Sequence, residues 1–175
     1  MTAYLKKGFT LIELLIVIAI LGVLAIVVLA AIDPIQQLAR TRDSGRKSTV
    51  TQLGHAVQAY YTSRNATYPT ASSTWIATLT AAGELATLPS QVNYGVGGST
   101  LCSASNSNVQ NEWCYDTVTT STGAVIYTSL ESTIEKSKCA AGTNAWFMYD
   151  AEEGRGGIVC SAGAPSSTST WNAIQ

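Results

Sequence analysis

The 175-residue sequence predicts an α+β protein, in which a long N-terminal α-helix carries a C-terminal antiparallel β-sheet head packed on its distal half. Three observations support this fold class. Residues 14–32 form an uncharged apolar run, residues 35–63 place apolar side chains at helical spacing, and short β-like runs follow in the distal part of the chain. The length is sufficient for one domain and one additional element.

The first element is the apolar segment. Residues 14–32 contain no charge and no proline, and 19 residues at ~1.5 Å each span ~28 Å, close to the thickness of bilayer hydrocarbon. Lys6 and Lys7 precede the run, so the positive-inside rule keeps the leader in the cytoplasm and the bulk of the chain outside. An ordinary cleaved signal peptide has a shorter apolar core, and a plain membrane anchor explains the length but not the acid Glu13. A carboxylate in hydrocarbon costs several kcal/mol and needs a partner or a task.

The second element is a helix beyond the membrane segment. Asp33-Pro34 predicts a kink, or a short break in which Asp33 caps a new helix and Pro34 is its first residue. An apolar stripe on this helix consists of Val50, Leu53, Val57, Tyr60 and Tyr61. Such a stripe needs a surface to bury against, and we expect that surface to be the head. We expect the first half of this helix to project. Its basic residues are expected to be solvated, or to meet lipid phosphates or acids of neighbouring subunits: Arg40, Arg42, Arg46 and Lys47.

The head is predicted to start with a short helix between Ser72 and Leu88, followed by an antiparallel sheet of about four strands. The β-like runs are Val92–Val96, Trp113–Val118, Ala124–Leu130, Ala145–Tyr149 and Gly157–Cys160, separated by turn-forming residues. The Ala124–Leu130 strand is expected to be partly buried on both faces. The polar stretch 103–109 is expected to be an exposed loop, and Trp171 suggests that the Ser/Thr-rich tail docks at its end.

Four cysteines follow the apolar segment, which indicates two disulfides in an oxidising compartment. Three pairings are open, and pairing between sequence neighbours is favoured because it needs the simplest loops: Cys102 with Cys114 and Cys139 with Cys160. Without a close Cys-x-x-Cys pair, a zinc site is not expected.

Composition and single residues exclude several functions. The chain has 10 basic and 11 acidic residues, and residues 65–175 are acidic, so no specific nucleic acid is predicted as a partner.

His55 is the only histidine, and the sequence offers no set of acid, base and nucleophile, so the chain is not expected to be an enzyme. A membrane-tethered enzyme is the least favoured alternative. Neither cofactor nor metal is expected. Asp150, Glu152 and Glu153 could begin a calcium site, which is the less favoured alternative, but they lack the alternation of a calcium loop and are interpreted as a solvated turn. Asn65-Ala66-Thr67 fits a glycosylation acceptor at Asn65, and a Ser/Thr run at 166–170 could carry O-linked sugars.

The N-terminal block resembles the prepilin signal of type IV pilins and type II secretion pseudopilins. The resemblance rests on Lys6-Lys7-Gly8, on Phe9 and on Thr10-Leu11-Ile12-Glu13, followed by the apolar helix. It implies four segments: a leader peptide (1–8), a transmembrane and filament-core helix (9–32), an amphipathic continuation of this spine (33–64) and a globular disulfide-bonded head (65–175).

The resemblance also implies how the chain is processed, where it is located and what it assembles into. A prepilin peptidase would cut between Gly8 and Phe9 and methylate the Phe9 amine, and Glu13 would attract the free amine of Phe9 in an adjacent subunit. The chain would start as a single-pass protein of the inner membrane and join a filament of the same or mixed pilins through the assembly machinery of that membrane. It would end in an extracellular pilus used for adhesion, twitching motility or DNA uptake, as a major or minor subunit. The alternative is a pseudopilin in a periplasmic filament of a type II secretion system.

Overall fold

The fold is described by a computed structural model, which covers residues 8–31, 33–95, 102, 109–119 and 122–167. The chain forms two compact units, residues 1–37 and residues 38–175, and each is described here by itself. The predicted docking of Trp171 and residues 103–108 of the exposed loop predicted at 103–109 lie outside the described residues, while Val109 is half-buried at the start of a strand, so the loop prediction is wrong for that residue.

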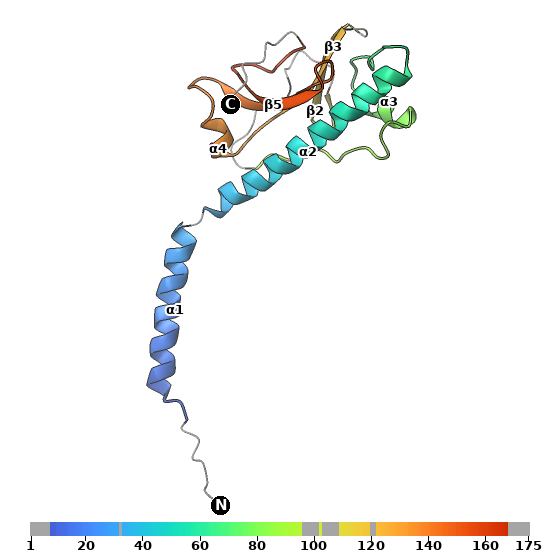
Figure 1. Ribbon diagram of the computed structural model, residues 1–175. Helices are drawn as coiled ribbons and strands as arrows, with labels where there is room; N and C mark the ends of the chain where they lie inside the picture. The colour runs from blue at the N-terminus through green and yellow to red at the C-terminus, as the bar shows by residue number, and fades with distance from the viewer. Residues whose placement is uncertain (1–7, 32, 96–101, 103–108, 120–121, 168–175) are drawn as a thin grey trace, which may run out of the picture. The chain divides into compact units, whose positions relative to one another are not determined.

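Two helices make up the N-terminal part. Helix α1 covers Leu11–Ala31 and helix α2 covers Pro34–Ser63 (Figure 1). Asp33 Oδ1 accepts hydrogen bonds from the backbone N–H groups of Ile35 and Gln36, both at 3.1 Å, and Pro34 opens α2. A proline is tolerated there because the first N–H groups of a helix have no partner within it. The predicted break with an Asp33 cap is confirmed.

The head contains one five-stranded antiparallel meander in the order β1-β2-β3-β4-β5. Its strands are β1 (Val109–Gln110), β2 (Trp113–Thr119), β3 (Thr122–Ser129), β4 (Asn144–Asp150) and β5 (Arg155–Ser161). Four of the five predicted β-like runs are therefore strands, and the α+β class is confirmed. Residues 92–95 form no strand, so the prediction of a strand at Val92–Val96 is wrong for the part that is described. Val92 is nevertheless buried, and its N–H donates to the carbonyl of Asn111 at 3.1 Å.

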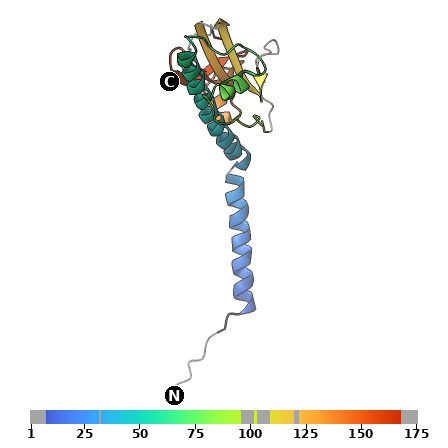
Figure 2. The ribbon, with the colours of Figure 1, turned by 90° about the vertical axis from the view of Figure 1, so that its right-hand side faces the viewer.

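Helix α2 lies across one face of this sheet, as the two ribbon views agree (Figures 1 and 2). The predicted stripe makes this contact, because Val50, Leu53 and Val57 are buried while Tyr60 and Tyr61 are half-buried. The stripe packs against aromatic side chains of the sheet, which include Trp113, Tyr115 and Tyr149. Burial already begins at Ala39, so the prediction that the first half of the helix projects is wrong from that residue onward.

The short helix of the head is α3 (Trp75–Ala81), which adds Trp75, Ile76 and Leu79 to the same core. Trp75 stacks on Tyr115 with ring centroids 4.8 Å apart. The predicted helix over 72–88 is too long, because the chain turns at Gly83 with φ +81°, a conformation that glycine adopts without steric cost.

The opposite face of the sheet is also covered. A second buried cluster there holds Cys102, Cys114, Val125, Tyr127, Trp146, Met148 and Val159. Strand β3 therefore alternates between two cores, with Ala124 and Ile126 in one and Val125 and Tyr127 in the other. The prediction that this strand is buried on both faces is confirmed.

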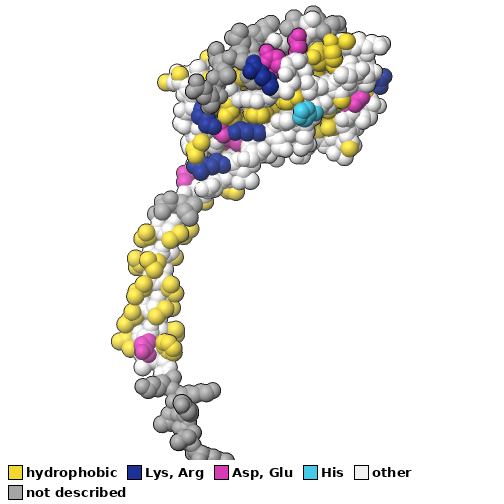
Figure 3. All heavy atoms as spheres, in the orientation of Figure 1, with side chains coloured by type: hydrophobic (Ala, Val, Ile, Leu, Met, Phe, Trp, Pro, Cys, Tyr) yellow, Lys and Arg dark blue, Asp and Glu magenta, His cyan; other side chains and the backbone are white. Residues whose placement is uncertain are grey.

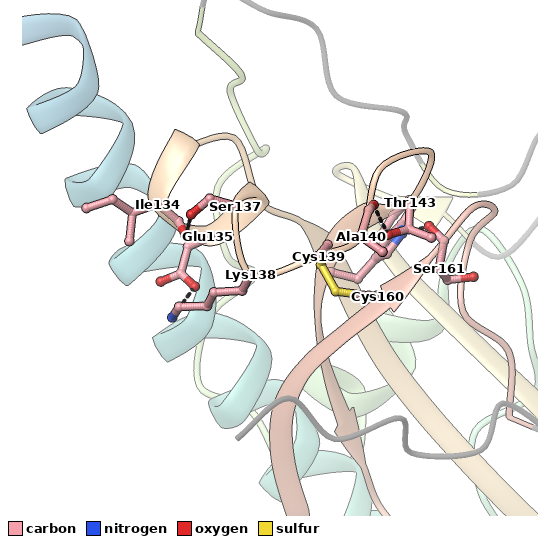
Figure 4. Close-up of a disulfide and its surroundings, with 10 residues drawn as sticks. Ile134, Glu135, Ser137, Lys138, Cys139, Ala140, Thr143, Cys160 and Ser161 are labelled. Carbon is pink, nitrogen blue, oxygen red and sulfur yellow. Dashed lines mark hydrogen bonds and ion pairs between the residues drawn. A yellow bond between two sulfur atoms is a disulfide. The ribbon is translucent and has the colours of Figure 1, made fainter.

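Two disulfides connect the head, Cys102–Cys114 and Cys139–Cys160, and they are the pairs that the sequence favoured. The second joins the segment after the one-turn helix α4 (Thr133–Lys136) to β5 (Figure 4). Each closes a short loop, of 12 and 21 residues, and such cross-links stabilise a fold mainly by restricting the unfolded chain.

The charged side chains of α2 between Arg42 and Lys47 contact the head rather than solvent alone. Arg46 and Asp43 are buried and joined at 2.7 Å, and Arg46 also reaches Glu131 Oε1 at 3.1 Å. Arg42 pairs with the same Glu131, and Lys47 lies 2.5 Å from Glu135. The expectation of solvated basic residues is therefore wrong for Arg42, Arg46 and Lys47, since their partners lie far away in the sequence and are brought in by the fold. Arg40 is exposed as expected.

Candidate functional site

Helix α1 carries its apolar side chains on every side, and none of those described is buried within this chain. Figure 3 shows hydrophobic side chains along the visible face of this helix. Residues 11–29 form the one helix among the described residues that is long and apolar enough to cross a membrane. At about 0.8 kcal/mol for each buried CH₂ group, such a surface is strongly driven out of water. It therefore needs lipid or other apolar helices around it.

The start of α1 is closed by a reciprocal cap. Glu13 Oε2 accepts hydrogen bonds from the backbone N–H and from the hydroxyl of Thr10, each at 2.8 Å. The backbone N–H of Glu13 in turn donates to Thr10 Oγ1 at 3.3 Å. This arrangement is a capping box, in which two otherwise unpaired donors at a helix start are satisfied. Glu13 thus has a partner within its own chain.

The predicted cut site lies immediately before this cap. Gly8 and Phe9 precede the first helical residue and have no regular secondary structure. Phe9 is 86% exposed, and no atom lies within 4 Å of the position that a Cβ would take on Gly8. A bond in such an exposed segment can enter a peptidase active site without unfolding α1. The new amine would be created four residues before Glu13.

The other predicted sites lie in the head. Asn65 follows the last turn of α2 and is exposed, with φ +51°, and its neighbour Ala66 donates to the carbonyl of Tyr61 at 3.0 Å. The acceptor triplet is therefore displayed on a turn. Asparagine is one of the few residues that enter this left-handed conformation readily.

The acidic turn after β4 uses its carboxylates locally. Asp150 Oδ1 accepts from the backbone N–H groups of Glu152 and Glu153, at 2.8 and 3.1 Å, and Glu153 pairs with Arg155. Within the described part of the chain, no group of three or more His, Cys, Asp or Glu side chains is placed to hold a metal ion. His55 is exposed on α2, and its Nδ1 lies 3.2 Å from the hydroxyl of Tyr149.

Sequence reasoning overlooked two features. The capping box had a local signal, since Thr10-x-x-Glu13 has the spacing of that motif. The buried network of Arg42, Asp43, Arg46 and Glu131 had none, because Asp43 and Glu131 are separated by 88 residues. Asp43 accepts from the backbone N–H groups of Glu131 and Ser132 in addition to its pair with Arg46.

The comparison with known proteins agrees with the N-terminal geometry. Residues 5–29 match the family model of the prokaryotic N-terminal methylation motif. No curated protein and no solved structure matches the chain. The matched segment contains Lys6, Lys7, the predicted cut site, the capping box and most of α1.

This motif implies processing by a prepilin peptidase and assembly into pilus-like filaments, with a single-pass membrane anchor before assembly. Pilin-type proteins are structural rather than enzymatic. The N-terminal segment of this chain is therefore a prepilin-type class III signal peptide with its apolar helix, as found in type IV pilins and pseudopilins.

Proposed function

We propose that the chain is a structural subunit, major or minor, of a type IV pilus, which supports adhesion, twitching motility or DNA uptake. The single observation that carries the proposal is α1, whose described apolar side chains are exposed and which starts at a capped carboxylate next to the predicted cut site. In the membrane, lipid surrounds this helix. In a filament, the α1 helices of other subunits replace the lipid at little cost, since both environments are apolar.

Processing prepares the chain for that exchange. Removal of residues 1–8 takes away Lys6 and Lys7 and leaves a methylated Phe9 amine, four residues before Glu13. The positive amine of an incoming subunit then pairs with the Glu13 carboxylate of its neighbour in the filament core. Two opposite charges in a low-dielectric core attract strongly, so this pair sets the axial register between otherwise featureless helices.

A disulfide-bonded head suits a fibre outside the cell, where thiols are oxidised. The second candidate is a pseudopilin of a type II secretion system. Its support is the exit from α2 through Tyr68-Pro69 into the short helix α3, a pattern common in pseudopilins. The two functions differ in where the filament stands, on the cell surface or in the periplasm.

The test is expression of the full chain in a bacterium with a type IV pilus machinery, followed by imaging of sheared surface filaments and mass spectrometry of their subunits. We expect filaments that contain this chain and start at methylated Phe9. Gly8→Arg is expected to leave the chain uncut, while Ala3→Arg, which adds the same charge away from the cut site, is expected to be processed normally. Filaments found only in the periplasm would favour the pseudopilin, and a chain that stays dispersed and uncut would refute both.

A further inference from the structure

A small cleft opens in the head between the last turns of α2 and the turn that follows β4. Its volume is about 210 Å³, and its walls include Gln58, Tyr61 and Thr62 from α2, Tyr68 from the segment after it, and Glu152. Clefts for drug-sized ligands are about 300–1,000 Å³, so this one takes a single small ring. It lies wholly within the unit 38–175, which does not include the apolar helix on which the proposed function rests.

The cleft contains an unused hydrogen-bonding group. Tyr68 is only 4% exposed, yet its hydroxyl forms no hydrogen bond with any residue that the structure describes. Other buried tyrosines of the head do have partners, since Tyr115 donates to the carbonyl of Pro69 at 2.9 Å and Tyr149 donates to Gln58 Oε1 at 2.9 Å. Tyr68 lines the cleft, so its hydroxyl is available there to a ligand hydroxyl.

Aromatic rings form one wall. Tyr61 and Tyr68 stack with centroids 4.3 Å apart and an interplanar angle of 30°. Burial, followed by the nearby phenol of Tyr61 and the carboxylate of Glu152, raises the pKa of Tyr68 to about 12, so its hydroxyl stays protonated at neutral pH and can donate. The negative faces of aromatic rings attract the weakly positive C–H groups of a sugar ring.

The charge of the cleft narrows the chemical class of ligand that it can bind. Its walls carry the Glu152 carboxylate and no Lys, Arg or His, so a phosphate or an acidic sugar would be repelled. Glu152 offers its carboxylate beside the aromatic wall, and Thr62 Oγ1, which donates to the carbonyl of Ala59, can still accept a hydrogen bond. The Gln58 amide is already bonded to Tyr149 and to the carbonyl of Ala151. We propose that this cleft binds one neutral hexose, such as the terminal sugar of a glycan, with its ring against Tyr61 and Tyr68 and its hydroxyl groups bonded to Tyr68 and Glu152.

The test is saturation-transfer difference NMR on the full chain in micelles of a zwitterionic detergent without a sugar head group. The ligands are the methyl glycosides of glucose, galactose, mannose and N-acetylglucosamine, and methylamine serves as the cationic comparison. At least one glycoside is expected to give saturable transfer. Tyr68→Phe, which removes the hydroxyl and keeps the ring, is expected to weaken that glycoside about fivefold, the value of one net hydrogen bond.

Tyr60→Phe is the control, because Tyr60 is a half-buried tyrosine of α2 that packs against the same core and does not line the cleft. It is expected to leave the affinity unchanged, and amide spectra show that each variant keeps its fold. The proposal is overturned if no glycoside saturates, if Tyr68→Phe binds as tightly as the original chain, or if methylamine binds and the glycosides do not.

Discussion

The ring of Tyr149 on β4 lies directly against the backbone of Gly54 on α2. A Cβ added to Gly54 would stand 2.5 Å from Tyr149 Cγ, well inside van der Waals contact. The hydroxyl of Tyr149 continues past this contact to Gln58 and His55 on the same helix. Gly54 therefore allows the helix to approach the sheet this closely, because a side chain at this position would clash with the Tyr149 ring.

This contact predicts opposite effects for two glycines of α2. Gly54→Ala is expected to lower the free energy of unfolding by about 1–3 kcal/mol, because overpacking at Tyr149 outweighs the gain of about 1 kcal/mol in helix propensity. Gly45→Ala is the matched control, since nothing lies within 4 Å of the added Cβ, and it is expected to be neutral or stabilising. Thermal unfolding of the full chain in micelles, followed by tryptophan fluorescence, measures both. Equal effects of the two changes would contradict the packing role.

The capping box separates two roles of Glu13. Glu13→Gln keeps an oxygen that can accept from Thr10 but removes the charge, whereas Glu13→Ala removes both. If the charge pairs with the amine of a neighbouring subunit, both variants are expected to insert and be cut but to give few sheared filaments. Thr10→Ala, which weakens the cap and keeps the charge, is expected to lose little filament. Normal filament yield from Glu13→Gln would show that the cap alone is required.

Removal of the buried cation from the network is expected to be costly. Arg46→Met leaves Asp43 and Glu131 without the guanidinium that joins them, and also removes the bond to the carbonyl of Asn93 at 2.6 Å. Breaking a buried ion pair from one side costs up to about 3–5 kcal/mol. Here Glu131 keeps its pair with Arg42, while Asp43 is left with backbone N–H donors and no cation. Arg40→Met, at an exposed position of the same helix, is expected to change stability by less than about 0.5 kcal/mol. Urea unfolding of both variants measures the difference, and similar midpoints would argue against the network.

The same network predicts acid sensitivity. Burial tends to raise the pKa of Glu131, but the hydrogen bonds from Arg42 and Gly95 and the charge of Arg46 outweigh it and hold this pKa below its ordinary value. A carboxyl with a lowered folded-state pKa stabilises the fold fully above its unfolded pKa of about 4.3, and this contribution is lost as the pH falls through the folded-state pKa. We expect Glu131→Gln to unfold at lower denaturant concentration at pH 7 and to lose less further stability below pH 4 than the original chain.

The matched control for acid unfolding is Glu153→Gln. Glu153 pairs with Arg155 at the surface, where solvent screens the interaction. This variant is expected to follow the pH dependence of the original chain. An equal loss of stability on acidification in the Glu131 variant and the original chain would assign the acid response to other carboxyls.

Short-range features of the fold were predictable because their causes lie within a few residues. Asp33-Pro34 contains both the cap and the residue that suits a helix start, so the break between α1 and α2 could be predicted. The disulfide pairs followed from short loops, and the N-terminal signal from a contiguous block. The exact extent of α3 and the loss of the strand at residues 92–95 were not predictable, since both depend on which backbone groups the sheet and its turns leave to be paired.

The sequence by itself determined the apolar helix, the N-terminal methylation motif and the helix–sheet order, because each depends on local composition and spacing. Only the tertiary structure decided where the charges of α2 go, why Gly54 is required, and that Tyr61, Tyr68 and Glu152 share a cleft. Asp43 and Glu131 meet across 88 residues, and a local pattern carries no information about such a distance. The fold supplies that information by closing α2 onto the sheet, where burial leaves each charge and each ring few possible partners.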